Sequence, residues 1–401
     1  MFDSSLDFAV FSGSPAFDVP LHVGRPNIGD RDSLLRRLHE MLDRRWITNN
    51  GPFVQELEQK LADFLGVRHC LAVCNATVGM EIALRATGLS GEVIVPSFTF
   101  IATAHACRWL GLKPVFADIR WIDHTIDVAD VERCISDRTT GIIGVHTWGN
   151  PCETSALQYL ADRYSLRVLY DAAHAFGVRN GQRMVGGFGD CEVFSFHGTK
   201  FFNSFEGGAI TTNDDALAAK IALMRNFGFA GLDNVVSDGT NGKLSEIHAA
   251  MGLTSLESLP FFLEINRRNY HAYANGLEGL PGIQLHQYQV PENSNCQYVV
   301  IDVDPESCPL SRDELLKILT TENVMARRYF WPCCHGMLPY REENPDGGLS
   351  LPVSNRVASG IIVLATSECT TLPQVELICG IIRRSLQQAD RLKAHFTRER
   401  R

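Results

Sequence analysis

Residues 168–175 read VLYDAAHA and contain the pattern on which the fold prediction depends. The apolar run from Val168 to Tyr170 is typical of a short buried strand, and Asp171 follows where that strand ends. Similar apolar runs occur at 93–95, 115–117, 142–145, 193–196 and 209–211. Helical patterns lie between several of these runs, at 101–110 and 157–164. Short strands that alternate with helices predict an α/β fold with a mostly parallel sheet covered on both faces.

Two helices are predicted before the first of these strands. The first begins at Pro52, a residue suited to the first position of a helix, and Gly66 is placed to end it. Its apolar side chains at positions 54, 57, 61, 64 and 65 form one face. The second follows residues 75–77 and carries apolar residues at positions 80, 83 and 84.

The length of the chain indicates more than one domain. Single hydrophobic cores stop growing near about 250–300 residues, and this chain has 401. We predict a large α/β domain over residues 1–260, with residues 1–20 as a loose N-terminal arm. Residues 261–401 are predicted to form a smaller α+β domain around a strand at 298–302. The basic end of the last helix is interpreted as a solvated face and a frayed tail.

Composition excludes several classes of protein. Lys and Arg number 37 against 46 Asp and Glu, and the net charge of −9 argues against a general nucleic-acid binder. No apolar run approaches the roughly 18 residues that cross a membrane. Residues 1–20 contain no Lys or Arg, so no secretory signal is predicted. The 12 cysteines form no CxxC pair and suit the reduced thiols of a cytoplasmic protein. No metal is expected, because Cys333, Cys334 and His335 lack a second ligand pair.

Polar residues follow three of the predicted strands, and in parallel sheets ligands collect beyond those strand ends. They are Asp171, Lys200 in the string SFHGTK at 195–200, and the string PSFTF at 96–100. A helix N-terminus at 76–77 would favour a phosphate. An acid, a lysine, an aromatic ring and a phosphate pocket together suggest pyridoxal phosphate. The lysine forms a Schiff base, and the carboxylate keeps the pyridine nitrogen protonated.

Each of these residues has an ordinary alternative. Asp171 and Thr77 could be helix caps, and Lys200 could be a solvated loop lysine. Phe100 could belong to the core, and His174 could be a structural histidine. The order of the residues along the chain, each at a strand end, favours a cofactor site over these separate explanations.

Five strings make the chain resemble the DegT-type family of nucleotide-sugar aminotransferases, which have the fold-type-I architecture of pyridoxal-phosphate enzymes. The strings are VPSFTFIAT at 95–103, DAAHAFG at 171–177, SFHGTK at 195–200, EGGA at 206–209 and NGKLSE at 241–246. They occur in the family's order and are more specific together than any one of them alone.

The resemblance implies a role for each matching residue. Lys200 would hold the cofactor covalently and move the proton between cofactor and substrate carbon. The other implied contacts are Asp171 to the pyridine nitrogen, His174 to the ring edge, Phe100 to the ring face, and Ala76, Thr77 and Ser195 to the phosphate. Asn241 would reach the phosphate of a neighbouring subunit, which implies a homodimer with shared sites. Some members have His in place of this lysine and act as dehydratases, so Lys200 favours transamination.

The substrate is predicted from residues 326–335, which read ARRYFWPCCH. This string resembles the sugar-contacting loop of members that act on dTDP-4-dehydro-6-deoxyglucose, with L-glutamate as the amino donor. Tyr329 and His335 would lie near the hexose or the diphosphate. Arg327 or Arg328 would pair with the diphosphate, because the guanidinium fork matches a phosphate. The alternative is a basic and aromatic surface loop without a ligand.

Other functions stay open at this point. The same chemistry could act at C3 of a keto sugar, or at C4 of a GDP-linked sugar as in perosamine synthesis. A regulatory protein that binds pyridoxal phosphate without turnover belongs to a different class. A nicotinamide-dependent dehydrogenase is disfavoured, because no GxGxxG string follows the first strand.

Overall fold

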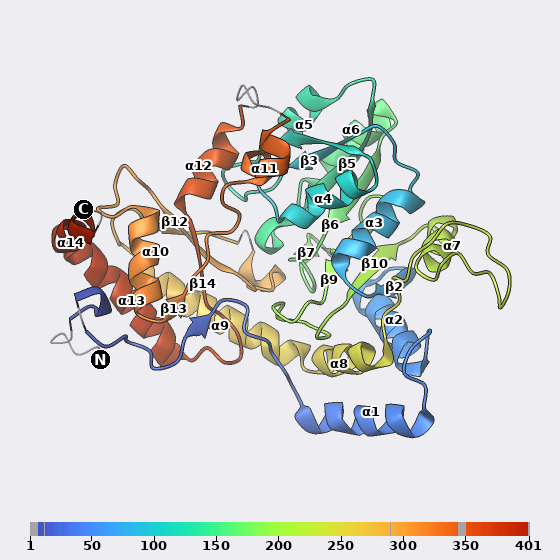
Figure 1. The fold of residues 1–401 in the computed structure, drawn as a ribbon, viewed down its shortest axis with the longest axis horizontal. Helices are drawn as coiled ribbons and strands as arrows, with labels where there is room; N and C mark the ends of the chain where they lie inside the picture. The colour runs from blue at the N-terminus through green and yellow to red at the C-terminus, as the bar shows by residue number, and fades with distance from the viewer. Residues whose placement is uncertain (1–6, 12, 289, 344–349, 400–401) are drawn as a thin grey trace.

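The computed structural model describes residues 7–11, 13–288, 290–343 and 350–399. Figure 1 shows a large domain built around one sheet and a small domain beside it, with α8 (Glu246–Glu257) and α9 (Leu259–Leu277) running from one to the other. The predicted boundary at residue 260 falls within the first turn of α9.

The large domain contains a seven-stranded sheet. Its strands lie in the order β2 (His69–Val73), β10 (Gly208–Thr212), β9 (Cys191–Ser195), β6 (Arg167–Asp171), β5 (Thr139–Val145), β3 (Glu92–Pro96) and β4 (Lys113–Ala117). The five strands from β9 to β4 are parallel, whereas β10 is antiparallel to both of its neighbours. This arrangement confirms the predicted α/β class with a mostly parallel sheet, and all six predicted strands of the large domain are present.

Helices cover both faces of this sheet, because its strands are apolar on both sides. Val93 and Val95 pack with α3, α4 and α7 on one face, whereas Ile94 packs with α5 and α6 on the other. Phe194 packs on that second face with α2 and α8. The helices are α1 (Arg31–Arg44), α2 (Pro52–Leu65), α3 (Ala76–Ala86), α4 (Ile101–Trp109), α5 (Val128–Cys134), α6 (Thr154–Tyr164) and α7 (Asp215–Met224).

Local signals explain where α2 and α3 begin. Helix α2 starts at Pro52, as predicted, and Gly66 ends it with a φ of 68°. The N-cap residue of α2, Gly51, offers no side chain, and the buried Glu246 carboxylate takes that place. It accepts hydrogen bonds from the backbone N–H groups of Phe53 at 2.9 Å and Val54 at 2.8 Å. A side chain at position 51 would collide with this carboxylate, so the glycine is required there.

A second buried carboxylate stands at the start of β3. Glu92 is 4% exposed and accepts hydrogen bonds from the Ser136 hydroxyl, Arg138 and Lys113. The Ser136 hydroxyl, followed by the two cations, lowers the pKa of Glu92 to about 2. The carboxylate therefore stays ionised over the whole neutral range.

The small domain has a three-stranded antiparallel sheet in the order β11, β12, β14. Strand β12 confirms the strand expected at 298–302, offset by one residue. The elements of this domain after α9 are β11 (Ile283–Leu285), β12 (Val299–Val303), α10 (Arg312–Thr321), β13 (Val324–Met325), α11 (Leu338–Arg341), α12 (Pro352–Gly360), β14 (Ile361–Leu364), α13 (Leu372–Gln387) and α14 (Ala389–Glu399). One apolar core joins the sheet to α9, α10, α13 and α14.

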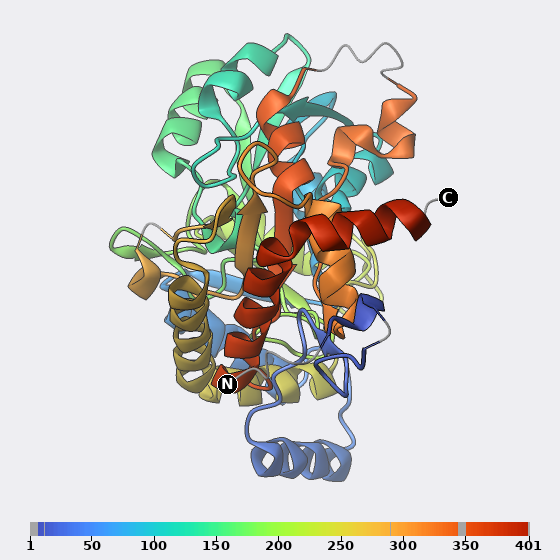
Figure 2. The same ribbon diagram turned by 90° about the vertical axis from the view of Figure 1, so that its left-hand side faces the viewer.

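The prediction of a loose N-terminal arm was wrong for the described part of residues 1–20. Phe8 and Phe17 are buried in the core of the small domain, and β1 (Leu21–His22) pairs with β13. Glu322 accepts hydrogen bonds from two backbone N–H groups of the segment, both at 2.8 Å. Arg391 of α14 pairs with Asp7 at 2.7 Å. Figure 2 shows this segment beside the C-terminal helices, so part of their basic face holds the arm.

The segment between β13 and α12 returns to the large domain. The backbone N–H of Cys334 donates to the Ser97 carbonyl at 2.9 Å. Cys334, Tyr340 and Leu351 are buried in the same apolar cluster as α3 and α4. The two domains are thus joined by packing as well as by the α8–α9 connection.

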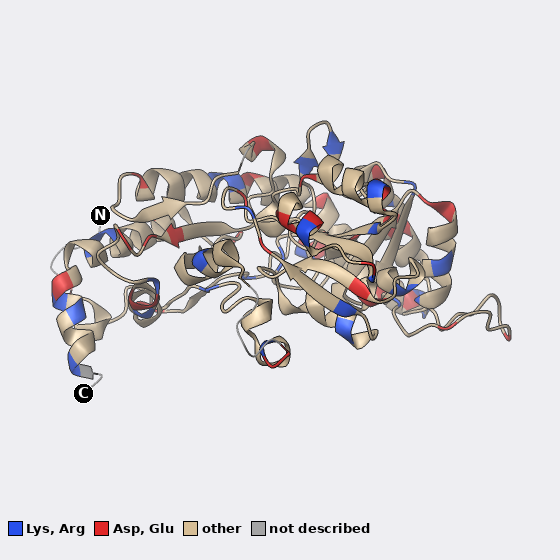
Figure 3. Cartoon of the chain, turned by 90° about the horizontal axis from the view of Figure 1, so that it is seen from above, with Lys and Arg blue, Asp and Glu red and all other residues tan. Residues whose placement is uncertain are grey.

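Charged residues of both signs are interspersed over the two domains (Figure 3). Within the described ranges, no helix is both long and apolar enough to span a membrane. The same part of the chain holds no group of three or more His, Cys, Asp or Glu residues placed to bind a metal ion.

Candidate active site

A cavity of about 620 Å³ opens at the carboxyl ends of β3, β6 and β9. Seven of the eight predicted cofactor residues line this cavity: Ala76, Thr77, Phe100, Asp171, His174, Ser195 and Lys200. They come from four separate segments of the chain, which the parallel sheet brings to one edge. The eighth, Asn241, does not line it.

Asp171 is held at the end of β6 by two hydrogen bonds. The Thr103 hydroxyl in the first turn of α4 donates to Asp171 Oδ2 at 2.7 Å, and the backbone N–H of Ala173 donates to Oδ1 at 3.1 Å. The Thr99 and Thr103 hydroxyls lie 3.1 Å apart and continue the network. These contacts fix the orientation of the carboxylate inside the cavity.

Lys200 lies in the turn after β9, and its amine faces the small domain. The backbone N–H of Lys200 donates to the His197 carbonyl at 2.8 Å and closes the turn. Lys200 Nζ donates to the Tyr298 hydroxyl at 3.1 Å. Tyr298 directly precedes β12 and was not singled out from the sequence, where it had appeared only as the start of a predicted strand.

His174 lies near this amine as a neutral ring. It is 7% exposed, and the Trp148 backbone N–H donates to its Nδ1 at 3.2 Å. Burial, and secondarily the charge of Lys200, lower the pKa of His174 well below its usual value of 6.5. Because Nδ1 is the acceptor, the neutral ring carries its proton on Nε2.

The N-terminus of α3 forms the opposite wall. The Asn75 side chain caps the helix by accepting from the Val78 N–H at 2.9 Å. The first N–H groups of a helix have no partner within it and favour an anion. Strand β10 approaches closely here: a side chain at Gly208 would lie 2.9 Å from the Ala76 nitrogen.

These residues fit pyridoxal phosphate. One cavity contains an amine for the aldehyde, an ordered carboxylate for the ring nitrogen, and a helix N-terminus for the phosphate. Phe100 is 57% exposed and offers a ring face in the same space. The residue types and their order around the cavity match the chemistry that the cofactor requires.

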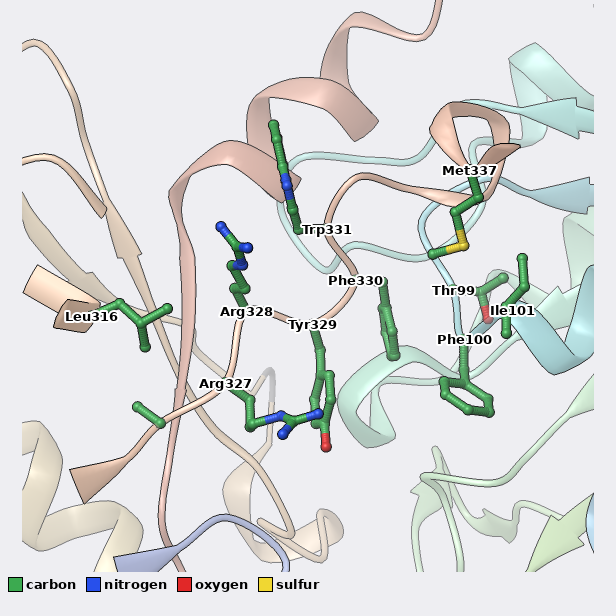
Figure 4. Close-up of a pocket in the computed structure, with 11 residues that line it drawn as sticks. Thr99, Phe100, Ile101, Leu316, Arg327, Arg328, Tyr329, Phe330, Trp331 and Met337 are labelled. Carbon is green, nitrogen blue, oxygen red and sulfur yellow. The ribbon is translucent and has the colours of Figure 1, made fainter. Parts of the chain in front are cut away.

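A second cavity of about 410 Å³ lies beside the first (Figure 4). Thr99, Phe100, Tyr329 and Phe330 line both cavities, so the two adjoin each other. The remaining wall comes largely from residues 326–331, which lie within the string predicted to contact the substrate.

The two arginines of that string have different surroundings. Arg328 pairs with Asp313 at 3.1 Å. The Arg327 guanidinium lies 5.4 Å from the centroid of the Tyr329 ring, and Figure 4 shows it running alongside that ring. Among the residues that the structure describes, no carboxylate pairs with Arg327. Of the two candidates, Arg327 is therefore the cation left available for an anionic ligand.

Two predicted site residues lie elsewhere. His335 contacts the Ser97 hydroxyl through Nδ1 at 2.5 Å and lines neither cavity. Asn241 lies on an exposed segment after α7, where its Oδ1 accepts from Lys243 Nζ at 2.7 Å. His335 thus lies outside the lining of both cavities, and within one subunit Asn241 lies outside the first cavity.

The sequence of the chain matches a known family and named relatives. The model of the DegT/DnrJ/EryC1/StrS aminotransferase family matches residues 29–383. Two relatives are named dTDP-4-amino-4,6-dideoxy-D-glucose transaminase. The one from Shigella dysenteriae is 41% identical over 315 residues, which are 79% of this chain and 86% of that protein. The one from Escherichia coli is 37% identical over 348 residues, 86% and 94% of the two chains.

Solved structures show the same likeness. DesI, crystallised in the presence of its TDP-sugar product, superposes with a TM-score of 0.93 at 43% identity and covers 98% of this chain and 99% of its own. Helicobacter pylori PseC, an aminotransferase of pseudoaminic acid biosynthesis, superposes with a TM-score of 0.86 at 26% identity, with 92% and 100% covered.

Proposed function

The chain belongs to the DegT/DnrJ/EryC1/StrS aminotransferase family, and from this premise we propose its substrates. It transfers the amino group of L-glutamate to C4 of dTDP-4-dehydro-6-deoxyglucose, giving dTDP-4-amino-4,6-dideoxyglucose and 2-oxoglutarate. The observation that carries this proposal is the adjacent pair of cavities, one with Lys200 and Asp171 and the other with Arg327. The names of the two curated relatives support the choice of sugar.

The first cavity would hold pyridoxal phosphate. Asp171 would face the ring nitrogen, Phe100 the ring, and Thr77, Ser195 and the N–H groups of α3 the phosphate, with Lys200 as the covalent anchor. When bound, this cofactor supplies an electron sink and carries the amino group between the two substrates.

The chain itself contributes binding and proton movement. Lys200 takes the proton from the α-carbon of glutamate and later returns a proton to C4 of the sugar, so both half-reactions use one amine. Arg327 offers a planar fork to the diphosphate. Tyr329 and Phe330 stand where the two cavities meet and exclude water from the reacting atoms.

A homodimer completes the proposal. The segment after α7 extends away from the large domain in Figures 1 and 3. Its exposed apolar side chains are Phe227, Phe229, Leu232, Val235 and Val236. Exposed apolar groups gathered on one projecting segment are typical of a protein interface. In a dimer formed through this segment, Asn241 would reach the phosphate bound by the other subunit.

The dimer has its own test. Leu232 is 94% exposed, so Leu232→Asp costs the isolated fold little but places a charge in the interface. Sedimentation is expected to show a monomer for this variant and a dimer for the unchanged chain. A dimer of undiminished stability in Leu232→Asp would contradict the assignment of this segment.

The reaction is tested in two halves on the cofactor-loaded protein. Addition of L-glutamate should change the visible absorbance of the bound cofactor, and dTDP-4-dehydro-6-deoxyglucose should then restore it. Lys200→Ala should show neither change at a measurable rate. Absorbance that changes with glutamate but is restored only by a 3-keto or GDP-linked sugar would overturn the proposed substrate and keep the aminotransferase. No change with glutamate would overturn the amino donor.

A further inference from the structure

The amine of Lys200 makes one side-chain hydrogen bond in the described part of the chain, and its partner is Tyr298. The two residues are 98 positions apart and belong to different domains. Lys200 Nζ lies 3.1 Å from the Tyr298 oxygen and 5.7 Å from the centroid of its ring, so it meets the edge that carries the hydroxyl.

Packing fixes the Tyr298 ring. It is 8% exposed and lies against Trp148, at 5.3 Å between centroids, and His174, at 4.6 Å. The Tyr288 hydroxyl donates to the Tyr298 carbonyl at 2.7 Å and anchors the backbone beneath it. A ring held on two sides has few alternative rotamers, so its hydroxyl stays at one place in the cavity.

The other groups near the amine do not compete for it. His174 is neutral and has Nδ1 occupied by the Trp148 N–H. No described carboxylate forms an ion pair with Lys200, and Asp171 is engaged by Thr103 and Ala173. The Tyr298 hydroxyl is therefore the group that can set where the amine rests when it is free.

We propose that Tyr298 is a positioning residue for Lys200, an inference that rests on the aminotransferase function proposed above. A hydroxyl can accept a hydrogen bond from the protonated amine and donate one to the neutral amine. The contact therefore persists while Lys200 gains the proton from the substrate carbon and gives it back. The proton passes between carbon and Nζ only, and the phenol keeps its own proton throughout.

Tyr298→Phe tests this proposal, because it keeps the packed ring and removes the hydroxyl. In the loaded full-length enzyme, kcat should fall about 10- to 100-fold, since misplacing a reacting group by about 1 Å costs up to about 100-fold. KM for glutamate should change by less than about twofold, because the hydroxyl does not bind the donor. Tyr273→Phe is the matched control. It removes a buried hydroxyl of the small domain, bonded to the Ala365 carbonyl at 2.9 Å, and should leave kcat unchanged.

A second readout does not depend on turnover. In the full-length chain without cofactor, acetic anhydride labels lysine amines, and peptide mass spectrometry gives the labelling rate of Lys200. Loss of one hydrogen bond should raise that rate about fivefold in Tyr298→Phe and leave it unchanged in Tyr273→Phe. Equal labelling of Lys200 in all three proteins, or an equal fall of kcat in the two variants, would overturn the proposal. Turnover that survives Lys200→Ala would instead overturn the proposed function. The labelling comparison would still test whether the Tyr298 hydroxyl positions the Lys200 amine.

Discussion

The hydroxyl of Thr103 is expected to keep the Asp171 carboxylate ready for the cofactor, and Thr103→Val tests this directly. Thr103 is 1% exposed, and its Oγ1 lies 2.7 Å from Asp171 Oδ2. Valine has nearly the same shape and offers no hydrogen. The carboxylate would keep only the longer bond from the Ala173 N–H, at 3.1 Å.

The magnitude follows from the kind of bond that is lost. A hydrogen bond to a charged acceptor contributes about 1.5–3 kcal/mol, which corresponds to about 10- to 150-fold in an equilibrium constant. Part of this contribution is already present in the cofactor-free chain, so the upper figure is a ceiling for the change in affinity. The expected loss of affinity is the free energy needed to orient the freed carboxylate toward the ring nitrogen when the cofactor binds.

The assay is the Kd of pyridoxal phosphate, measured by equilibrium dialysis in a Lys200→Ala background so that only non-covalent binding counts. Thr103→Val should weaken binding by more than twofold and by at most about 150-fold. Thr321→Val is the control, because that hydroxyl bonds only the Ile318 carbonyl of its own helix among the described residues. A Kd for Thr103→Val within twofold of the background value, with an unchanged melting temperature, would refute the reasoning.

Three further predictions concern the substrate cavity and the buried carboxylates. In steady-state kinetics, Arg327→Gln should raise KM for the sugar nucleotide at least about 10-fold. Arg328→Gln should raise it much less, because the Arg328 guanidinium already pairs with Asp313, and equal effects of the two substitutions would contradict the assignment. Glu246→Ala leaves two buried N–H groups of α2 unpaired and should lower the free energy of unfolding by about 3–6 kcal/mol in urea titrations, with Glu246→Gln between it and the unchanged chain. The folded-state pKa of Glu92 is about 2 against a usual 4.5, so its stabilisation is complete above pH 4.5 and is lost as the pH falls toward 2. The melting temperature of Glu92→Gln should therefore fall less steeply over that pH range than the melting temperature of the unchanged chain. Parallel curves for the two proteins would contradict this prediction.

Most of the large domain could be predicted because its signals are local. Apolar runs marked six strands of the large sheet, β3, β4, β5, β6, β9 and β10, and Pro52 and Gly66 marked the ends of α2. Helix α1 was missed although Asp30 caps it, because its many charged residues hide a narrow apolar face. Strand β2, whose run is HCLAV, was missed although Gly66 ends the helix just before it.

The site contacts that the sequence did not predict have a common physical cause. Lys200 and Asp171 lie in strings whose local pattern indicates a cofactor site. Tyr298 contacts Lys200, 98 positions away, and Thr103 contacts Asp171, 68 positions away. No pattern of neighbouring residues reports such a contact. His335 is a related case. It lies in a string that resembles the family, but the string does not indicate that the His335 ring contacts the Ser97 hydroxyl.

The segment that returns from the small domain to the large one constrains how this enzyme can diverge. Its first part carries Arg327 and Tyr329 at the substrate cavity, and its later part fills the large-domain core with Cys334, Tyr340 and Leu351. A change of length between Tyr329 and Cys334 to accept a different sugar would pull Cys334 and Tyr340 out of register with α3 and α4. New specificity is therefore expected to arise by exchange of side chains on a backbone of constant length. For the same reason, a gene fragment ending at the domain boundary would encode a large domain with an unfilled core.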